Sequence, residues 1–326
     1  MPQQPFMKTS DRIFIAGHRG LVGSAIRRGL EARGYTNLLL RSHAELDLRD
    51  GAATERFFRQ ERPEHVFLAA AKVGGIIANN TYPATFIGEN LAIQSSIIEA
   101  AHRAEVQRLL FLGSSCIYPK LAPQPIAEES LLTGPLEPTN RAYALAKIAG
   151  VEMCWSFNRQ YGTRYLAAMP SNLYGPGDNF DLTSSHVLPA LIRKAAEAAK
   201  SGAKELVVWG SGQPRRELLY SDDMADASIY LMNLDEAAYA TLLRDDVPPL
   251  VNIGTGEDIT IRDLAALVMK IVGFQGEIVF DATKPDGTPR KVLDVGRIRT
   301  LGWKHSVELE DGIRRTYESW VTSQKL

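Results

Sequence analysis

The glycine-rich turn after the first apolar run constrains the fold more than any other feature of this sequence. Residues 12–17 form an apolar run typical of a buried strand, and residues 21–33 have a helical pattern. Between them, Gly17, Gly20 and Gly23 follow the spacing G-x-x-G-x-x-G. Glycine permits a sharp turn and close approach to a ligand, and free N–H groups at a helix start attract a pyrophosphate. The turn therefore predicts a strand–turn–helix unit that binds a dinucleotide.

The first half of the chain alternates apolar runs with helical patterns, which favours a parallel sheet. Further strands are predicted at 38–40, 65–70, 108–113 and 165–169, and helices at 51–60, 90–104 and 143–161. The pattern then changes, with a loop at 174–185, a helix at 186–201, a strand at 205–209, a helix at 222–234 and a strand at 250–253. The expected fold class is α/β, a Rossmann-type doubly wound parallel sheet with a smaller mixed α/β substrate-binding lobe.

Composition narrows the class of protein. The net charge of −1 gives no global field for nucleic acid or a membrane surface. The two cysteines, Cys116 and Cys154, have no metal-site or disulfide spacing. Residues 1–10 lack the apolar core of a signal peptide, and no apolar stretch is long enough to span a membrane. We expect a cytoplasmic protein without a metal site.

The end of the second predicted strand bears on the choice of cofactor. An acid there would bind the ribose of NAD, but the strand ends at Arg41 and is followed by Ser42 and His43. With Arg19 from the glycine turn, these residues suit a 2′-phosphate and predict NADP(H), unless Arg41 and His43 are solvated surface groups. Asp47 either contacts the adenine or caps the next helix, and Ala69–Ala71 either admit the nicotinamide ribose or belong to the core.

Tyr143 and Lys147 form the pattern Y-x-x-x-K, which places both side chains on one helix face. A nearby ammonium favours tyrosinate and brings tyrosine closer to proton exchange near neutrality. Alone the pattern is weak, because a helix-surface pair would look the same. Ser114 and Ser115 follow the fourth predicted strand about 30 residues upstream, where a hydroxyl can reach the same carbonyl oxygen as the tyrosine. The combination predicts carbonyl reduction.

These features resemble the extended short-chain dehydrogenase/reductase family of nucleotide-sugar enzymes. Longer segments add to the resemblance, namely 71–76 (AKVGGI), 113–119 (GSSCIYP), 170–176 (PSNLYGP), 185–187 (SHV) and 284–288 (KPDGT). Over essentially the whole chain they are similar to 3,5-epimerase/4-reductases that act on GDP-4-dehydro-6-deoxy-D-mannose. The resemblance implies this substrate, NADP(H), and a homodimer packed through helices of the cofactor domain, including the helix that bears Tyr143.

The resemblance also implies catalytic roles. Ser114, Tyr143 and Lys147 match the reducing triad, and Cys116 and His186 match the acid and base of epimerisation. Protons at C3 and C5 both flank the C4 ketone, so removing either gives an enolate that Ser114 and Tyr143 can stabilise. A thiol and an imidazole both titrate near enough to neutrality for this work. Without the surrounding motifs, Cys116 would be read as core and His186 as a surface or capping residue.

The expected cofactor contacts are Gly17, Arg19, Gly20, Leu21, Val22, Gly23, Arg41, Asp47, Ala70, Lys147, Pro170 and His186. The expected substrate contacts are Asn172, Lys194, Trp209, Arg216 and Lys291, with Arg290 as a further candidate. Arg216 is the strongest diphosphate candidate, because guanidinium matches phosphate oxygens bidentately. Trp209 either stacks on guanine or belongs to the core. Lys194 stands where the family often has arginine, and His43 where a second arginine can serve the 2′-phosphate.

We expect an NADP-binding Rossmann domain of residues 8–178 plus about 222–254, and a substrate-binding lobe of about 179–221 and 255–326. Two other enzymes of the same fold remain alternatives, a nucleotide-sugar 4-epimerase and a 4,6-dehydratase. The first usually has an acid at the second strand end, and the second an acid pair where this chain has Cys116-Ile117. A cofactor-binding protein without catalysis is a third alternative, against which the intact set of reactive residues argues.

Overall fold

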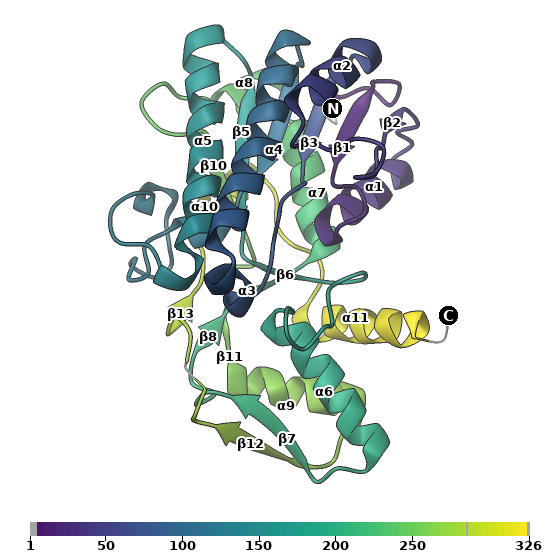
Figure 1. Cartoon of the computed structure of the whole chain (residues 1–326), viewed down its shortest axis with the longest axis vertical. Helices are drawn as coiled ribbons and strands as arrows, with labels where there is room; N and C mark the ends of the chain where they lie inside the picture. The colour runs from purple at the N-terminus through teal and green to yellow at the C-terminus, as the bar shows by residue number, and fades with distance from the viewer. Residues whose placement is uncertain (1–4, 285, 325–326) are drawn as a thin grey trace.

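A six-stranded parallel sheet forms the centre of the molecule in the computed structural model, which describes residues 5–284 and 286–324 (Figure 1). Its strand order is β10-β5-β4-β3-β1-β2, and every neighbouring pair runs parallel. The strands are β1 (Ile13–Ala16), β2 (Leu38–Leu39), β3 (His65–Leu68), β4 (Arg108–Leu112), β5 (Tyr165–Pro170) and β10 (Leu250–Ile253). All but β2 are fully buried, as expected for strands covered on both faces.

Helices cover the sheet in two layers, which confirms the doubly wound α/β class. One layer pairs α1 (Leu21–Ala32) with α7 (Ser221–Met232), and the other contains α2 (Gly51–Glu61), α4 (Pro83–Arg103) and α5 (Arg141–Tyr161). The strand order reverses between β1 and β3, so the carboxyl end of β1 lies at the topological switch point where such sheets bind ligands. The glycine turn therefore begins at this switch point.

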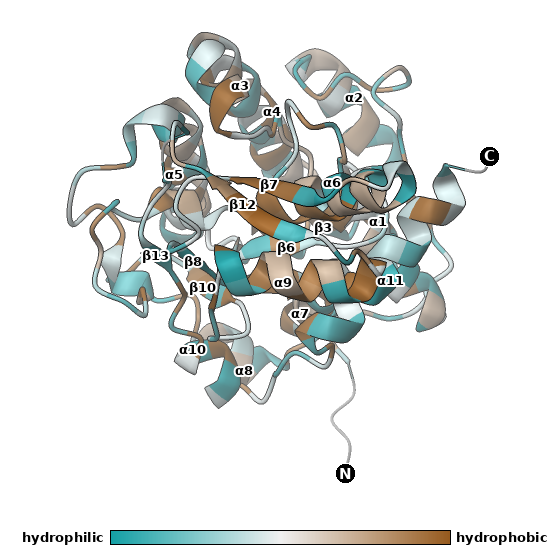
Figure 2. Ribbon diagram, turned by 90° about the horizontal axis from the view of Figure 1, so that it is seen from below, coloured by the Kyte–Doolittle hydropathy of each residue, from teal (hydrophilic) through white to brown (hydrophobic). Residues whose placement is uncertain are grey.

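A smaller lobe lies beyond the carboxyl ends of these strands and has its own apolar core. Strand β7 (Glu205–Trp209) pairs in parallel with β12 (Glu277–Asp281), and α6 (Val187–Ser201) and α9 (Ile261–Val272) pack beside them. Helix α11 (Leu309–Ser323) closes this core against α9. Figure 2 shows apolar colour along β7 and β12, and alternate residues of β7 remain exposed.

Short strands connect the two parts. Strand β6 (Asn172–Tyr174) pairs with β9 (Leu218–Tyr220), and β8 (Arg215–Arg216) lies between β11 (Ile259–Thr260) and β13 (Arg290–Lys291). The 3-10 turns are η1 (Ser115–Ile117), η2 (Glu128–Ser130) and η3 (Pro138–Asn140). These elements lie between the large sheet and the lobe in Figure 1.

Several elements differ from the sequence predictions. Helix α4 begins at Pro83 rather than at residue 90, because proline fits the first helical turn. Helix α3 (Ile76–Thr81) was not predicted, since four of its six residues are polar or small. The segment around α10 (Gly296–Thr300) was expected in the lobe, but Ile298 and Trp303 pack into the larger core. Helix α8 (Glu236–Ala240) is one further short helix at the edge of the sheet.

Among the described residues, none of the helices combines the length and apolarity needed to cross a bilayer.

Candidate active site

At the glycine turn, the backbone just after β1 lies unusually close to the first turn of α1. Gly17 has a left-handed φ of 85°, and a Cβ on Gly23 would lie 2.1 Å from the Gly17 carbonyl oxygen. Helix α1 begins directly after Gly20, and its first turn, with Leu21 and Val22, contains no acidic residue. The first N–H groups of a helix have no intrahelical partner, so they can bind a pyrophosphate. This cradle fits a dinucleotide cofactor.

The region after β2 contains two acids that the sequence reasoning missed. The Arg41 guanidinium lies 2.5 Å from Glu61. The hydroxyl and backbone N–H of Ser42 both donate to Glu45, at 2.6 and 2.7 Å. Hydrogen bonds from Ser42, with the charges of Arg19 and Arg41, lower the pKa of Glu45. The pattern S-x-x-E at 42–45 is a capping-box signature and could have revealed this contact.

The other residues expected near the 2′-phosphate and the adenine lie at the surface. Arg19 and His43 are exposed. Asp47 forms an ion pair of 2.7 Å with Arg49, whose hydrogen bonds lower the pKa of Asp47. Asp50, and not Asp47, caps α2 by accepting a hydrogen bond from Ala53 at 3.0 Å. The alternative that Asp47 is the helix cap is therefore wrong.

Two further predicted cofactor residues lie at strand ends of the large sheet. Ala70 follows β3 and packs so closely on the turn that a Cβ on Gly17 would lie 2.8 Å from its Cα. Pro170 is the buried last residue of β5. Both positions lie at the carboxyl edge of the sheet, where the glycine turn also begins.

Tyr143 and Lys147 lie on adjacent turns of α5, beside the end of β4. The buried Lys147 ammonium donates to the Leu112 carbonyl oxygen at 2.7 Å, and burial lowers its pKa to about 7. Its Nζ lies 5.9 Å from the centre of the Tyr143 ring. Burial raises the pKa of Tyr143, and a hydrogen bond with Ser114 acts in the opposite direction. The predicted triad is thus one contiguous group.

Cys116 and His186 belong to different elements, and Lys291 interacts with both of them. Ser114 caps η1 and accepts a 3.3 Å hydrogen bond from the Cys116 backbone N–H. Cys116 is a free, partly buried thiol, and Lys291 Nζ lies 3.6 Å from its sulfur. His186 is the N-cap residue of α6 and is exposed to solvent. The protein atoms around it and the charge of Lys291 nonetheless lower its pKa.

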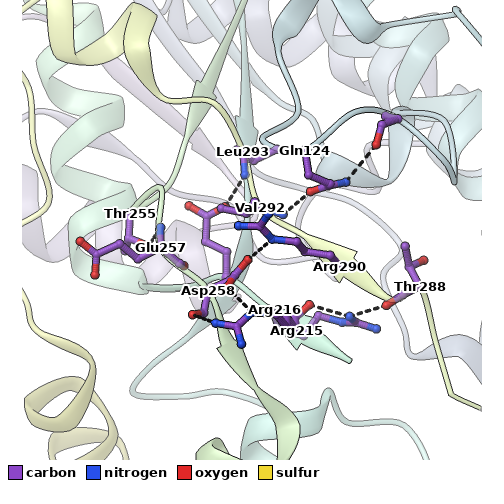
Figure 3. Close-up of polar contacts among 12 residues, drawn as sticks. Gln124, Arg215, Arg216, Thr255, Glu257, Asp258, Thr288, Arg290, Val292 and Leu293 are labelled. Atoms are coloured by element: carbon purple, nitrogen blue, oxygen red, sulfur yellow. Dashed lines mark hydrogen bonds and ion pairs between the residues drawn. The ribbon is translucent and has the colours of Figure 1, made fainter. Parts of the chain in front are cut away.

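The expected substrate residues lie on the lobe and on the connecting strands. Asn172 donates to the Glu217 carbonyl oxygen at 2.8 Å. Arg216 donates to the Thr288 carbonyl oxygen at 2.6 Å and is the register partner of Lys291 across β8 and β13. Burial lowers the pKa of Arg216. These contacts place Arg216 beside β13, and Figure 3 shows Arg216 close to Thr288.

Trp209 is 48% exposed, so the alternative that it belongs to the core is wrong. The ammonium groups of Lys194 and Lys284 lie 5.0 and 5.4 Å from its ring centre. An exposed ring beside two cations suits a ligand that carries both an aromatic base and phosphate. Pro285, part of the 284–288 motif, lies outside the described residues.

A small cavity lies between the segment that follows β4 and the junction strand β13. Its lining includes Cys116, Asn140, Thr288, Arg290 and Lys291. A wider hollow at the far end of the lobe, between the end of α6 and the turn before β12, contains none of the predicted site residues. Within the described ranges, His, Cys, Asp and Glu side chains form no cluster that could hold a metal ion.

Comparison with known proteins agrees with this geometry. Residues 13–254 match the family model described as the NAD dependent epimerase/dehydratase family. A GDP-L-fucose synthase of Escherichia coli (strain K12) is 58% identical over 318 residues, covering 97% of this chain and 98% of the relative.

Two solved structures extend the similarity to the whole fold. A GDP-6-OMe-4-keto-L-xylo-heptose reductase from C. jejuni has a TM-score of 0.91 at 40% identity, covering 98% of this chain and 99% of the other. A GDP-L-fucose synthetase from Naegleria fowleri bound to NADP has a TM-score of 0.89 at 27% identity, covering 100% and 97%.

Proposed function

The chain belongs to the NAD dependent epimerase/dehydratase family, and we propose that it converts GDP-4-dehydro-6-deoxy-D-mannose to GDP-L-fucose. It acts as a 3,5-epimerase and an NADPH-dependent 4-reductase. The observation that carries this function is the Cys116 thiol beside the Ser114–Tyr143–Lys147 group. Lys291 links this thiol to His186 at the start of α6, because its ammonium contacts the sulfur and its charge acts on the imidazole. Reduction of a ketone needs only the triad, so the additional thiol and imidazole account for the inversions.

The cofactor is NADP(H), which supplies a hydride to C4. The turn from Gly17 to Gly23 and the start of α1 hold its pyrophosphate, since a side chain at Gly23 would fill the cradle. Arg19 and Arg41 would bind its 2′-phosphate. Because Glu45 and Glu61 lie beside these arginines, binding of the phosphate has to compete with two carboxylates.

Epimerisation begins when Cys116 or His186 removes the proton at C3 or C5. The electron pair of the broken C–H bond moves to the C4 oxygen, where the hydroxyl groups of Ser114 and Tyr143 stabilise the enolate. The other member of the pair returns a proton on the opposite face. Two such inversions, at C3 and C5, change the 4-ketone from the D to the L series without a change of oxidation state, and reduction at C4 then completes the L-galacto configuration.

Reduction uses the same hydroxyl groups. As hydride reaches C4, Tyr143 gives its proton to the C4 oxygen. The Lys147 ammonium, held by the Leu112 carbonyl oxygen, compensates the negative charge that develops on Tyr143. Lys147 would also hold the bound cofactor by donating a hydrogen bond to its nicotinamide ribose.

Substrate recognition is divided between the two parts. Arg216 binds the diphosphate, Lys194 and Trp209 contact the guanosine side, and Asn172 bonds the sugar. The large sheet, with residues 8–178 and about 222–254, forms the NADP-binding domain, and 179–221 with most of 255–326 forms the substrate-binding lobe. The segment around Ile298 and Trp303 belongs with the larger core.

We also propose a cytoplasmic homodimer packed through α4 and α5. The two helices lie side by side in Figure 1, and Leu145 and Tyr161 of α5 are exposed large apolar side chains. Light scattering of the purified chain tests the assembly, with a monomer at micromolar concentration as the opposing result.

The decisive experiment measures NADPH oxidation with GDP-4-dehydro-6-deoxy-D-mannose and with its TDP and UDP analogues. We expect turnover with the GDP sugar and formation of GDP-L-fucose, with weak turnover of the others. Deuterium from solvent should enter C3 and C5 even without NADPH. Reduction without inversion would make the protein a 4-reductase only, and equal turnover with NADH and NADPH would remove the proposed role of Arg19 and Arg41.

A further inference from the structure

Lys291 contacts one of the two residues proposed for epimerisation, and its charge acts on the other. Its ammonium is within hydrogen-bond distance of the Cys116 sulfur, at 3.6 Å. The same charge acts on His186, where it disfavours the imidazolium form. A thiol beside an ammonium favours the thiolate, which is the form able to accept a proton. The contact therefore bears directly on the base of the reaction.

The residues on both sides of Lys291 are held by hydrogen bonds, and Figure 3 shows those of Arg290, Val292 and Leu293. On one side, Arg290 donates to the Asp258 carboxylate at 2.5 Å. On the other, the N–H groups of Val292 and Leu293 donate to the side chains of Gln124 and Glu217 at 2.9 and 2.7 Å. The fold therefore determines where the Lys291 side chain starts, as a positioning role requires.

Other charged or titratable groups also face Cys116, and they differ from Lys291 in their contacts. Tyr143 approaches from α5. Four more line the same cavity, namely Tyr118, Lys120, Glu137 and Arg290. The Tyr118 hydroxyl donates to Asn252 at 2.6 Å. Glu137 accepts hydrogen bonds from Thr139 and Asn140, and Arg290 is held by Asp258. Among the described side chains, the Lys291 ammonium alone has a hydrogen bond to the sulfur.

We propose that Lys291 is a positioning residue for epimerisation, whose ammonium hydrogen-bonds the Cys116 sulfur and holds it as the thiolate base. This inference rests on the proposed function. When the base acts, the C3–H or C5–H bond breaks, the proton forms an S–H bond, and the electron pair goes to the C4 oxygen. His186 then gives a proton to the same carbon from the opposite face, the C4 ketone re-forms, and the imidazole regains a proton from solvent. The thiol loses its proton to solvent, and the ammonium favours that return to thiolate before the second inversion.

The test compares Lys291→Met, Lys291→Arg and a matched control, Lys120→Met, which removes a cation from the same cavity. The first measurement is the pH profile of Cys116 alkylation by iodoacetamide, with Cys116→Ser as the blank and Cys154 fully buried. We expect Lys291→Met to react about tenfold more slowly at pH 7, because the sulfur loses its ammonium partner. Lys291→Arg should retain most of the reactivity, and Lys120→Met all of it.

The second measurement is solvent-deuterium incorporation at C3 and C5, alongside NADPH and GDP binding. Lys291→Met should lose deuterium exchange in proportion to its loss of Cys116 thiolate. It should still bind NADPH, which would show that the variant folds. A wild-type alkylation profile combined with weaker GDP binding would overturn the inference and leave Lys291 as a diphosphate contact. If the wild-type chain exchanges no substrate protons while alkylation still shifts in Lys291→Met, the proposed function fails and the lysine–thiol contact stands.

Discussion

At the scale of single residues, the reactive groups owe their properties to neighbours from other elements. Lys147 has a pKa lowered to about 7 because it is buried, and its one hydrogen bond goes to the end of β4. Cys116 gains an ammonium from β13, and Tyr143 a hydrogen bond from Ser114. Among the described residues, the other cysteine, the buried Cys154, has no such ammonium beside its sulfur. Environment therefore distinguishes the two cysteines.

Replacing Cys116 with serine should abolish deuterium incorporation at C3 and C5, because a hydroxyl is too weak a base near neutrality. We expect a loss of about 10²–10⁴-fold, the usual range for one general base, with NADPH affinity unchanged. Cys154→Ala is the matched control and should keep full exchange, since Cys154 is buried in α5 away from the cavity. Mass spectrometry of the recovered sugar measures both, and full exchange in Cys116→Ser would remove this residue from the mechanism.

Replacing Lys147 with methionine should abolish reduction but stabilise the cofactor-free protein. Burial lowers the pKa of Lys147 from 10.5 to about 7, so the unfolded chain binds more protons between these values. Wild-type stability therefore rises with pH across this window, whereas that of the variant does not. The variant also loses the hydrogen bond to Leu112, which offsets part of its advantage. We therefore expect its free energy of unfolding to exceed that of the wild type by about 1–3 kcal/mol at pH 7, and the difference to become smaller toward pH 10. Urea unfolding at both pH values measures it, and a pH-independent difference would contradict the assigned cause.

At the scale of elements, the glycine turn depends on the absence of side chains at two points. Gly17 has a backbone conformation that other residues rarely adopt, and Gly23 leaves room for the Gly17 carbonyl group. Together they let α1 begin at the switch point of the sheet with its N–H groups free for a ligand. The turn and α1 thus act as one binding element.

Gly23→Ala should weaken NADPH binding by at least 100-fold, because the new Cβ would lie 2.1 Å from the Gly17 carbonyl oxygen and would displace the turn. The control is Gly88→Ala in α4, where an added Cβ meets no atom within 4 Å. That variant should bind NADPH normally and gain about 0.5–1 kcal/mol of stability from helix propensity. Fluorescence titration gives both affinities, and equal affinity in Gly23→Ala would refute the close-packed turn.

At the scale of the whole molecule, the buried Glu217 ties the two parts together. Its carboxylate accepts the N–H groups of Gly256, which follows β10, and of Leu293, which follows β13, both at 2.7 Å. Burial raises its pKa to about 7 against these hydrogen bonds. Because β13 also bears Lys291, the same carboxylate helps to fix the candidate site between the large sheet and the lobe.

Glu217→Gln tests this link through its pH dependence. A folded pKa of about 7 against 4.5 unfolded means that the native state holds an extra proton in this window. The contribution of Glu217 to the free energy of unfolding of the wild type therefore decreases by up to about 3 kcal/mol as the pH rises from 4.5 to 7. Glutamine does not titrate, so the difference between variant and wild type should move in favour of the variant from pH 5 to pH 8. Chemical unfolding at these pH values measures the shift, and a constant difference would show that Glu217 is already ionised.

The features that can be predicted from the sequence are those that depend on residues close together in the chain. The turn at Gly17–Gly23, the Tyr143–Lys147 pair and the buried strands follow from glycine stereochemistry, helical spacing and apolar patterning, and the resemblance supplied the roles of Cys116 and His186. The assignments of these site residues stay predictions until the variants are made.

Only the tertiary structure decided which distant groups meet. Lys291 lies 175 positions from Cys116 in the chain, Glu217 joins two loops, and Trp209 proved to be exposed. No local pattern encodes such contacts, because they depend on how short strands such as β8 and β13 pair after the two cores have formed. Electrostatic and desolvation effects act through space, so the chemistry of the site is determined only once folding has brought these charges together.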